Sequence, residues 1–446
     1  MAATGKAKPL FIALAVLLSV IAYTLDLPLA GQGQVVMAIT VFIGTMWFTE
    51  ALPLHVTALI VPVLLLLLGG FSTREAFSPF FASTIVLFFG GFMIARAMQK
   101  HGLDKQIAVS FISRFGTTPA GFLLGIMVIT AFLSFWISNT ASTAIMLPIV
   151  LYAVSKSKLE GKGSNTTKVL VLGVAFAATI GGIGTIVGTP PNGITVADLS
   201  EKGIEVSFVE WMFYAMPFVI LFLPVAWFIL LRVYKPEISK IEMHRKKGRW
   251  TGKHKCVLAV GAFTMLLWVS SFIHGVSDSV VSLIAVVFLY LFGLLETEDV
   301  SKIRWSALLL FGGGLSLGAA IDASGVSPYL GDLLGGLVAG QGILMLFISV
   351  LVFAVVMTLS ASNTATAALI VPVVIPLAAV LGVDIKELAI LAGIGTSLDF
   401  LIPVGTPPSA IAYSSGHITV ADMFRAGIFI TVAGILLMAV MAWLYW

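Results

Sequence analysis

Long apolar segments separated by short polar ones run through the whole chain of 446 residues. An α-helix needs roughly 20 predominantly apolar residues to cross the hydrocarbon core of a bilayer. Eleven segments approach that length, at residues 9–27, 35–50, 54–70, 82–99, 168–199, 207–232, 256–274, 279–295, 305–321, 386–416 and 420–445. The pattern therefore predicts an all-α integral membrane protein with about eleven transmembrane helices.

Two further apolar segments, 119–154 and 341–382, each carry the polar tripeptide Ser-Asn-Thr near the middle, centred on Asn139 and Asn363. Polar and unpaired backbone groups are costly in a bilayer, so two copies in matching apolar surroundings indicate a site. The short arm that follows the first copy, residues 141–154, favours a re-entrant hairpin with a polar tip over two full crossings. We therefore predict two re-entrant hairpins.

A second motif, Gly-Thr-Pro-Pro, begins at Gly188 and again at Gly405. Proline lacks an N–H donor and interrupts helices, so each copy predicts a broken helix, at 188–192 and 405–409. Each break follows one Ser-Asn-Thr hairpin in the chain. The paired motifs therefore indicate two related halves.

The halves also share tryptophan and Phe-Gly-Gly positions, which extends the repeat over most of the chain. We divide the chain into a first transmembrane helix (1–34), a first repeat (35–234), a basic cytoplasmic linker (235–255) and a second repeat (256–446). Each repeat contains five crossings, an odd number, so the second copy is inverted relative to the first. Inverted repeats with broken helices that meet near the midplane are typical of secondary transporters.

The composition excludes a water-soluble domain, because 59% of the residues are hydrophobic and 10% are charged, against about 25% charged in soluble domains. The net charge of +4 is small and its carriers are scattered, so no nucleic-acid partner is expected.

The predicted topology places 22 of the 25 Lys and Arg residues in the cytoplasm and leaves Arg74, Lys202 and Lys386 outside. This asymmetry predicts a cytoplasmic N-terminus and an external C-terminus. Compact loops indicate a bacterial inner membrane, and the basic linker is a candidate contact for membrane lipid.

Hairpin tips and helix breaks at membrane depth expose backbone groups that can bind ions. Helix starts carry free N–H groups and partial positive charge, which suit an anion. Hydroxyl, amide and carbonyl oxygens suit a hard cation such as sodium. The paired motifs therefore predict one anion site between two cation sites, and the predicted site contains no Arg or Lys. A third Ser-Asn-Thr, at 164–166, lies in a polar segment and is expected to be only a loop.

Asp399 lies inside a predicted span, and intramembrane carboxylates are candidates for ion coupling. No Gly-Lys-Ser/Thr phosphate loop is present in the sequence, which argues against an ATP-driven pump. The sequence also lacks a nucleophile-and-base pair or a metal-ligand motif. We therefore expect no enzyme activity and no organic cofactor.

With these motifs in place, the chain resembles the divalent anion–sodium symporter family. The resemblance covers nearly the whole chain and includes the run from Trp47 to Leu54 beside the paired motifs. It implies a homodimer with elevator-type movement, sodium as the coupling ion, and a C4-dicarboxylate substrate such as succinate, malate or fumarate.

The resemblance also implies the roles of individual residues. The first sodium site would use Ser134, Ser138, Asn139 and Gly188. The second would use Thr358, Ala361, Asn363 and Gly405. The substrate would contact Asn139, Thr140, Asn363 and Thr364, with Pro190 and Pro407 lining the site. Two departures from the family pattern are Asp399 and Ser409, at positions where a small or apolar residue and an asparagine are usual.

Three alternatives to sodium symport stay open at this point. A dicarboxylate exchanger fits the same motifs, and a proton-coupled anion transporter would use Asp399. An ion channel fits less well, because two broken repeats that meet at a midplane suit alternating access better than a continuous pore.

Overall fold

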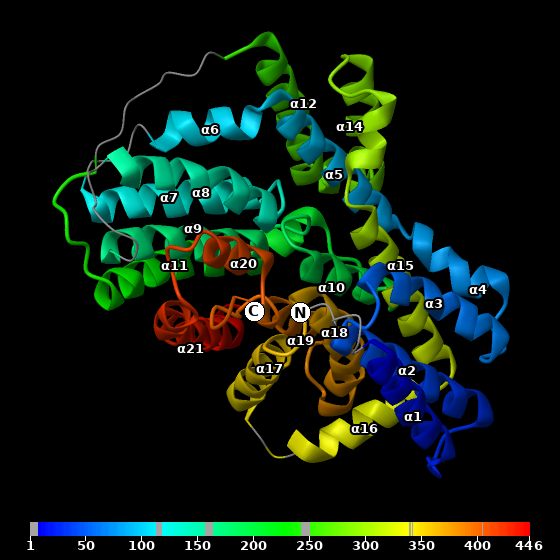
Figure 1. Ribbon diagram of the computed structural model, residues 1–446. Coiled ribbons are helices and arrows are strands. Elements are labelled where there is room, and N and C mark those ends of the chain that lie inside the picture. The colour runs from blue at the N-terminus through cyan, green and yellow to red at the C-terminus, as the bar shows by residue number, and fades with distance from the viewer. Residues whose placement is uncertain are drawn as a thin grey trace.

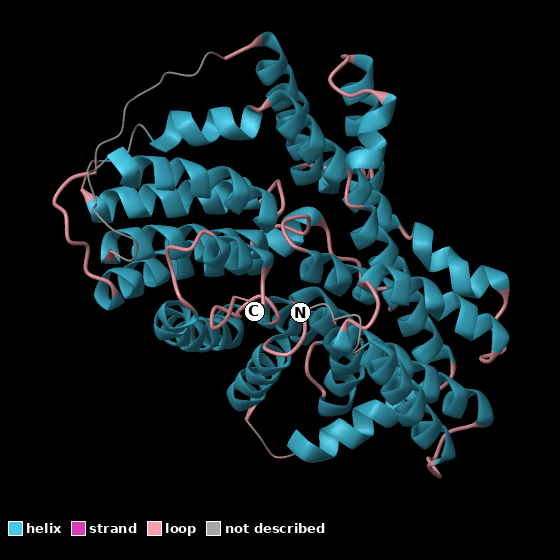
Figure 2. Ribbon diagram, in the orientation of Figure 1, coloured by secondary structure: helices cyan, strands magenta, loops and turns pink. Residues whose placement is uncertain are grey.

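The computed structural model describes residues 8–112, 118–156, 164–241, 250–338, 340, 342–403 and 405–446. These residues form helices and connecting loops without a strand (Figure 2), so the predicted all-α class is confirmed. Residues 1–7, before the first helix, and 242–249, in the predicted basic linker, lie outside the described residues.

The first half contains helices up to α11, followed in the second half by α12 to α21. The first-half elements are α1 (Lys8–Thr24), α2 (Gly31–Thr49), α3 (Leu54–Leu67), α4 (Thr73–Phe77), η1 (Ser78–Phe81), α5 (Ser83–His101), α6 (Leu103–Ile112), α7 (Pro119–Ser134), α8 (Asn139–Lys156), α9 (Asn165–Ile183), α10 (Pro190–Glu201) and α11 (Phe208–Val233). The second-half elements are α12 (Gly252–Val269), α13 (Ser271–His274), α14 (Asp278–Leu291), η2 (Thr297–Lys302), α15 (Trp305–Ala323), α16 (Val326–Val338), α17 (Ile343–Thr358), α18 (Asn363–Leu381), α19 (Ile385–Gly395), α20 (Pro407–Ser414) and α21 (Val420–Tyr445).

Seven helical segments among the described residues are long and apolar enough to cross a membrane. They are Gly31–Thr49, Thr73–His101, Asn165–Ile183, Phe208–Val233, Trp305–Ala323, Asn363–Leu381 and Val420–Tyr445. Shorter apolar helices, among them α1, α3, α7, α8, α14 and α17, accompany them. The protein is therefore an integral membrane protein. The helix α18, an arm of the second predicted hairpin, is itself long enough to cross.

Equivalent tryptophans make equivalent contacts in the two halves. The indole of Trp47 donates to the Leu54 carbonyl at 3.2 Å, where α3 begins. The indole of Trp268 donates to the Asp278 carbonyl at 3.1 Å, where α14 begins. Each bond holds the connection between two long helices, α2 and α3 in the first half and α12 and α14 in the second, so both halves fix this corner in the same way.

The helices of each half pack against partners in the other half. Away from the predicted site, α3 packs on α15 and α14 packs on α5. Around the predicted site, α10 packs on α18 and α19, whereas α20 packs on α8 and α9 (Figure 1). This reciprocal packing places the second broken helix beside the first hairpin and the first broken helix beside the second hairpin.

The breaks lie earlier than the predicted 188–192 and 405–409. The first non-helical segment covers 184–189, and Pro190 and Pro191 open α10. The second covers the described residues 396–403 and 405–406, and Pro407 and Pro408 open α20. Proline is accepted in the first helical turn, where its missing N–H would have no intrahelical partner, so these prolines begin helices.

Some short helices in the structure were not predicted from the apolar pattern of the sequence. The helices α6 and α16 occupy matching places, after α5 and α15 respectively. Gly102 and Gly325, which precede them, both adopt left-handed backbone with φ of 68° and 76°. Glycine permits this conformation without a steric penalty, which explains its presence at both corners.

Candidate functional site

Both Ser-Asn-Thr tips begin helices, α8 and α18. Ser138 Oγ accepts a hydrogen bond from the Ala141 amide at 3.2 Å, and Ser362 Oγ accepts one from the Ala365 amide at 3.3 Å. Serine at this position satisfies an amide that has no intrahelical partner. The asparagine and threonine that follow then lie, partly buried, in the first turn of each helix, beside the unpaired amides.

The third Ser-Asn-Thr, at 164–166, was expected to be only a loop, but it lies at the start of a helix. Ser164 Oγ accepts from the Thr167 amide at 3.2 Å and caps α9, which begins at Asn165. Helix capping therefore accounts for the serine in all three copies. The first and last copies differ from it because they lie where two helices of a hairpin meet.

Asn139 is the centre of the first tip. Ser134 Oγ lies 2.6 Å from the Asn139 side-chain amide and donates to the Ala178 carbonyl at 2.7 Å. With the amide oriented to satisfy its neighbours, the Asn139 nitrogen donates to the Gly188 carbonyl at 3.3 Å. The structure therefore brings together Ser134, Asn139 and Gly188, three of the residues predicted for the first cation site, with Ser138 at the preceding cap.

Glycines allow this close approach. A Cβ atom at Gly182 would overlap the Asn139 side chain, and one at Gly188 would lie 3.0 Å from the Ser134 carbonyl oxygen. The carbonyl of Gly182 also borders Gly188. Several carbonyl and side-chain oxygens thus converge between the α7–α8 tip and the first break.

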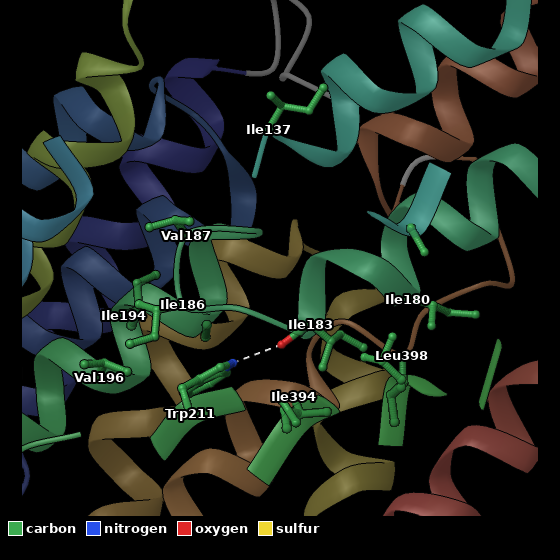
Figure 3. Close-up of a cluster of buried hydrophobic side chains, with 14 of the residues drawn as sticks. Ile137, Ile180, Ile183, Ile186, Val187, Ile194, Val196, Trp211, Ile394 and Leu398 are labelled. Atoms are coloured by element: carbon green, nitrogen blue, oxygen red, sulfur yellow. Dashed lines mark hydrogen bonds between the residues drawn. The ribbon is translucent and has the colours of Figure 1, made fainter. Parts of the chain in front are cut away.

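The first break is held in shape by buried polar side chains. Asn192 Nδ2 donates to the carbonyls of Gly182, Ile183 and Thr185 at 2.9, 3.2 and 2.7 Å. The Trp211 indole donates to the Ile183 carbonyl at 3.0 Å, within a cluster of buried isoleucines, valines and leucines (Figure 3). Non-helical backbone is tolerated at membrane depth when protein groups satisfy it, and these two side chains do so.

The second tip is less fully bonded. The hydroxyl of Thr358, the counterpart of Ser134, donates to the Val355 carbonyl at 2.7 Å. Among the described residues, the buried oxygens Asn363 Oδ1, Thr366 Oγ1 and Ser397 Oγ have no hydrogen-bond partner. Ala361 is buried beside this tip. Unpartnered buried oxygens are rare in folded proteins, so these atoms stay available to a ligand.

Asp399 adds a carboxylate to the second break. It lies between α19 and α20, outside the continuous helix that the sequence predicted. Its Oδ1 accepts from the Leu401 amide at 3.1 Å, while the buried Oδ2 has no partner among the described residues. That Oδ2 lies directly against Gly405. Asp399 is therefore next to a residue predicted for the second cation site.

The predicted substrate residues lie at the starts of helices. Thr140 and Thr364 are partly buried in the first turns of α8 and α18. Pro190 is partly buried at the start of α10, and Pro407 is exposed at the start of α20. Ser409, one of the departures, accepts from the Thr406 hydroxyl at 2.9 Å and makes no bridge like that of Asn192.

One basic side chain reaches the first tip, contrary to the prediction of a site without Arg or Lys. Arg304 Nη2 donates to Thr140 Oγ1 at 3.5 Å across 164 residues of sequence. Sequence reasoning missed Arg304 and Gly182, since each acts through a contact between distant segments. It also missed Asn192, whose role depends on the irregular backbone just before it. The motif spacing that marked Asn139 carries no information about these contacts.

The site offers hydroxyl, amide and carbonyl oxygens for a cation and helix-start amides for an anion. Among the described residues, no group of three or more His, Cys, Asp or Glu side chains could hold a metal ion. A helical membrane protein with two interrupted helices facing two polar tips has the architecture of a transporter, not of an enzyme.

The family model for the sodium:sulfate symporter transmembrane region matches residues 5–446, and the chain belongs to that family. An uncharacterized transporter of Haemophilus influenzae is 35% identical over 436 residues, covering 94% of this chain and 93% of that protein. The sodium-dependent dicarboxylate transporter SdcS of Staphylococcus saprophyticus is 33% identical over 451 residues, covering 93% of this chain and 86% of that protein.

Two solved structures share the fold at low sequence identity. The YdaH transporter of Alcanivorax borkumensis is 12% identical with a TM-score of 0.59, covering 98% of this chain and 97% of that chain. MtrF of Neisseria gonorrhoeae, from a class of antimetabolite efflux pumps, is 13% identical with a TM-score of 0.61, covering 98% and 95%. The likeness shows a shared fold.

Proposed function

We propose that this protein is a secondary active transporter of small divalent anions that couples their movement to sodium. C4-dicarboxylates such as succinate, malate and fumarate are the proposed substrates. The sodium-dependent dicarboxylate transporter SdcS, at 33% identity over most of both chains, supports this choice.

The observation that carries the proposal is the convergence of oxygen atoms at the first tip and first break. The Ser134 hydroxyl oxygen and the Ala178 and Gly188 carbonyl oxygens each lie within hydrogen-bond distance of the Asn139 side-chain amide. Oxygen ligands of this kind suit hard cations. Sodium bound there, and at Thr358, Ala361, Asn363 and Gly405, would be transported with the substrate.

The anion would bind between the two tips. Asn139, Thr140, Asn363 and Thr364 would contact its carboxylates, because each lies in the first turn of α8 or α18. The helix-start amides and the bound sodium ions would balance its charge. Pro190 and Pro407 would border the site from the starts of the broken helices.

The reciprocal packing of the two halves supports two related halves. We propose that these halves form an inverted repeat with two re-entrant hairpins and eleven crossings. In this arrangement the N-terminus lies in the cytoplasm and the C-terminus outside a bacterial inner membrane. We further propose a homodimer in which α7–α10 and α17–α20 move together as an elevator. The basic segment 235–255 would face the cytoplasm and its lipid headgroups.

A second candidate is proton coupling through Asp399, alone or beside sodium. The observation that favours it is the buried Oδ2 without a partner, directly against Gly405. A carboxylate in this position can bind either a proton or a sodium ion.

Uptake of radiolabelled succinate into proteoliposomes tests the function. One arm has an inward sodium gradient, a second has an inward proton gradient without sodium, and a third has internal succinate without either gradient. Symport predicts uptake in the first arm into vesicles without internal dicarboxylate. Uptake confined to the second arm would indicate proton coupling, and uptake confined to the third would indicate an exchanger. Absence of uptake in all arms would reject succinate as a substrate.

A further inference from the structure

Arg304 brings a guanidinium group to the first tip from the opposite half of the protein. It precedes α15 and reaches Thr140, the second residue of α8, with 3.5 Å between Nη2 and Oγ1. This distance is long for a hydrogen bond, so the contact holds the guanidinium weakly. Arginine has five N–H donors, and the Thr140 hydroxyl takes one of them.

The guanidinium has no carboxylate partner among the described residues. By contrast, other basic side chains of the described residues pair with Asp or Glu, although each is still between a fifth and about a quarter exposed. They are Arg96, Lys100, Lys168, Lys202 and Lys386. Arg304 is also partly buried. Taking a charge out of water without a counter-charge is costly, and an anionic ligand would remove that cost.

The ligand that fits is a carboxylate. The planar guanidinium fork matches the two oxygens of a carboxylate. The first amides of α8, which have no intrahelical partner, lie beside Thr140 on the same tip. A carboxylate placed there would accept from Arg304 and from the helix start together.

The second tip lacks this group. The residue that precedes α5, in the place that Arg304 has before α15, is Ala82. Among the described residues, a fixed positive charge therefore lies at one tip only, and the substrate site is asymmetric. One carboxylate of a dicarboxylate would face the guanidinium and the other would not, whatever the number of sodium ions.

We propose that Arg304 is a substrate-binding residue that holds one carboxylate of the dicarboxylate at the Thr140 tip. This inference rests on the proposed function and adds a recognition element outside both paired motifs. It implies that the protein prefers dianions over monoanions of the same size, because the guanidinium pairs with one carboxylate and leaves the other to the second tip.

The test measures succinate and monomethyl succinate binding to purified full-length protein in saturating sodium, together with sodium-driven succinate uptake. Arg304→Gln should raise the succinate dissociation constant roughly 10-fold to 100-fold, as expected for a lost charge-assisted hydrogen bond. It should also reduce the preference for succinate over its monomethyl ester. Arg304→Lys, which keeps the charge without the fork, should fall between Arg304→Gln and the wild type.

Lys302→Gln is the matched control, because it removes one positive charge from the exposed end of the same connection. It should bind succinate within about twofold of the wild type, since an exposed charge contributes little. Succinate binding by Arg304→Gln equal to that of the wild type would overturn the proposal. If Arg304→Gln does not fold, the test falls to Arg304→Lys. The proposal would be overturned if Arg304→Lys binds succinate as tightly as the wild type and keeps the same preference for succinate over its monomethyl ester. Failure of wild-type uptake would instead reject the proposed function.

Discussion

The side chain of Asn139 fills the space that a Cβ atom at Gly182 would need. Gly182 lies six residues before Gly188, and the residue six before Gly405 is Asp399. The two breaks therefore differ at the same position. At the first break, Gly182 leaves room for the Asn139 side chain. At the second break, the Asp399 carboxylate packs against Gly405.

Replacement of Gly182 by alanine should displace Asn139 from Ser134 and Gly188. Close-packed interiors do not absorb an added methyl group at such short range. We expect sodium-driven succinate uptake to fall by roughly 10-fold or more, because loss of the contacts that orient an ion ligand typically costs this much in affinity or activity. Gly314→Ala is the control, because a Cβ atom there meets nothing within 4 Å. Equal uptake by the two variants would contradict the geometry of the first tip.

Asn139→Ala and Asn363→Ala should each abolish uptake while the fold is retained. Asn139 loses its bonds to Ser134 and Gly188, and Asn363 loses a buried oxygen that faces no protein partner. We expect a loss of about 100-fold or more, since both cation and anion would lose a ligand. Uptake rates are compared at equal amounts of monodisperse protein. Wild-type rates in both variants would rule out the paired tips as the site.

Asp399→Asn tests the role of the carboxylate against Gly405. The variant keeps the size of the side chain and removes its charge. If Asp399 contributes to the second cation site, the sodium concentration for half-maximal uptake should rise by about tenfold. The measurement is uptake against sodium concentration at fixed pH. An unchanged sodium dependence would remove Asp399 from that site, and loss of a proton-driven component alone would assign it to proton coupling.

The Asp299 carboxylate links η2 to α5 and should contribute to stability. It accepts from Arg96 Nε and Lys100 Nζ at 2.9 and 2.7 Å. Burial alone would raise the pKa of Asp299, but hydrogen bonds from Lys100, the Glu296 amide and Arg96 outweigh it and hold the pKa well below its usual range. Asp299→Asn should therefore destabilise the protein at neutral pH by about 1–3 kcal/mol.

The pH dependence of this effect follows from the sign of the shift. A carboxylate with a lowered pKa in the folded state stabilises that state above its unfolded pKa of about 4 and loses the contribution as the pH falls further. The difference in melting temperature between wild type and Asp299→Asn should be constant near neutral pH and shrink below about pH 4. A difference that grows toward acid pH would contradict this assignment.

Local sequence signals predicted much of the site because they act over short distances. Polar tripeptides inside apolar segments marked the helix starts at Asn139 and Asn363, and these starts are present. The cap of α9 at Ser164 was also readable, since serine before an apolar run is a helix-start signal. The polar composition around it led to the wrong prediction of a loop.

Contacts between distant segments could not be predicted in this way. Arg304 and Thr140 are 164 residues apart, and their approach depends on how α15 packs relative to α8. Asn192 bridges three carbonyls only because the backbone from Gly182 to Thr185 turns around its side chain. Periodicity and motif spacing describe single segments, so neither reports such an arrangement.

The most direct test of the central claim is the affinity of purified protein for succinate in sodium and in choline at equal ionic strength. If sodium binds at the tips beside the substrate, each ligand must tighten the other by the same factor. The account predicts a succinate dissociation constant at least about tenfold lower in sodium, with this difference lost in Asn139→Ala. Equal succinate affinity in sodium and in choline would contradict it.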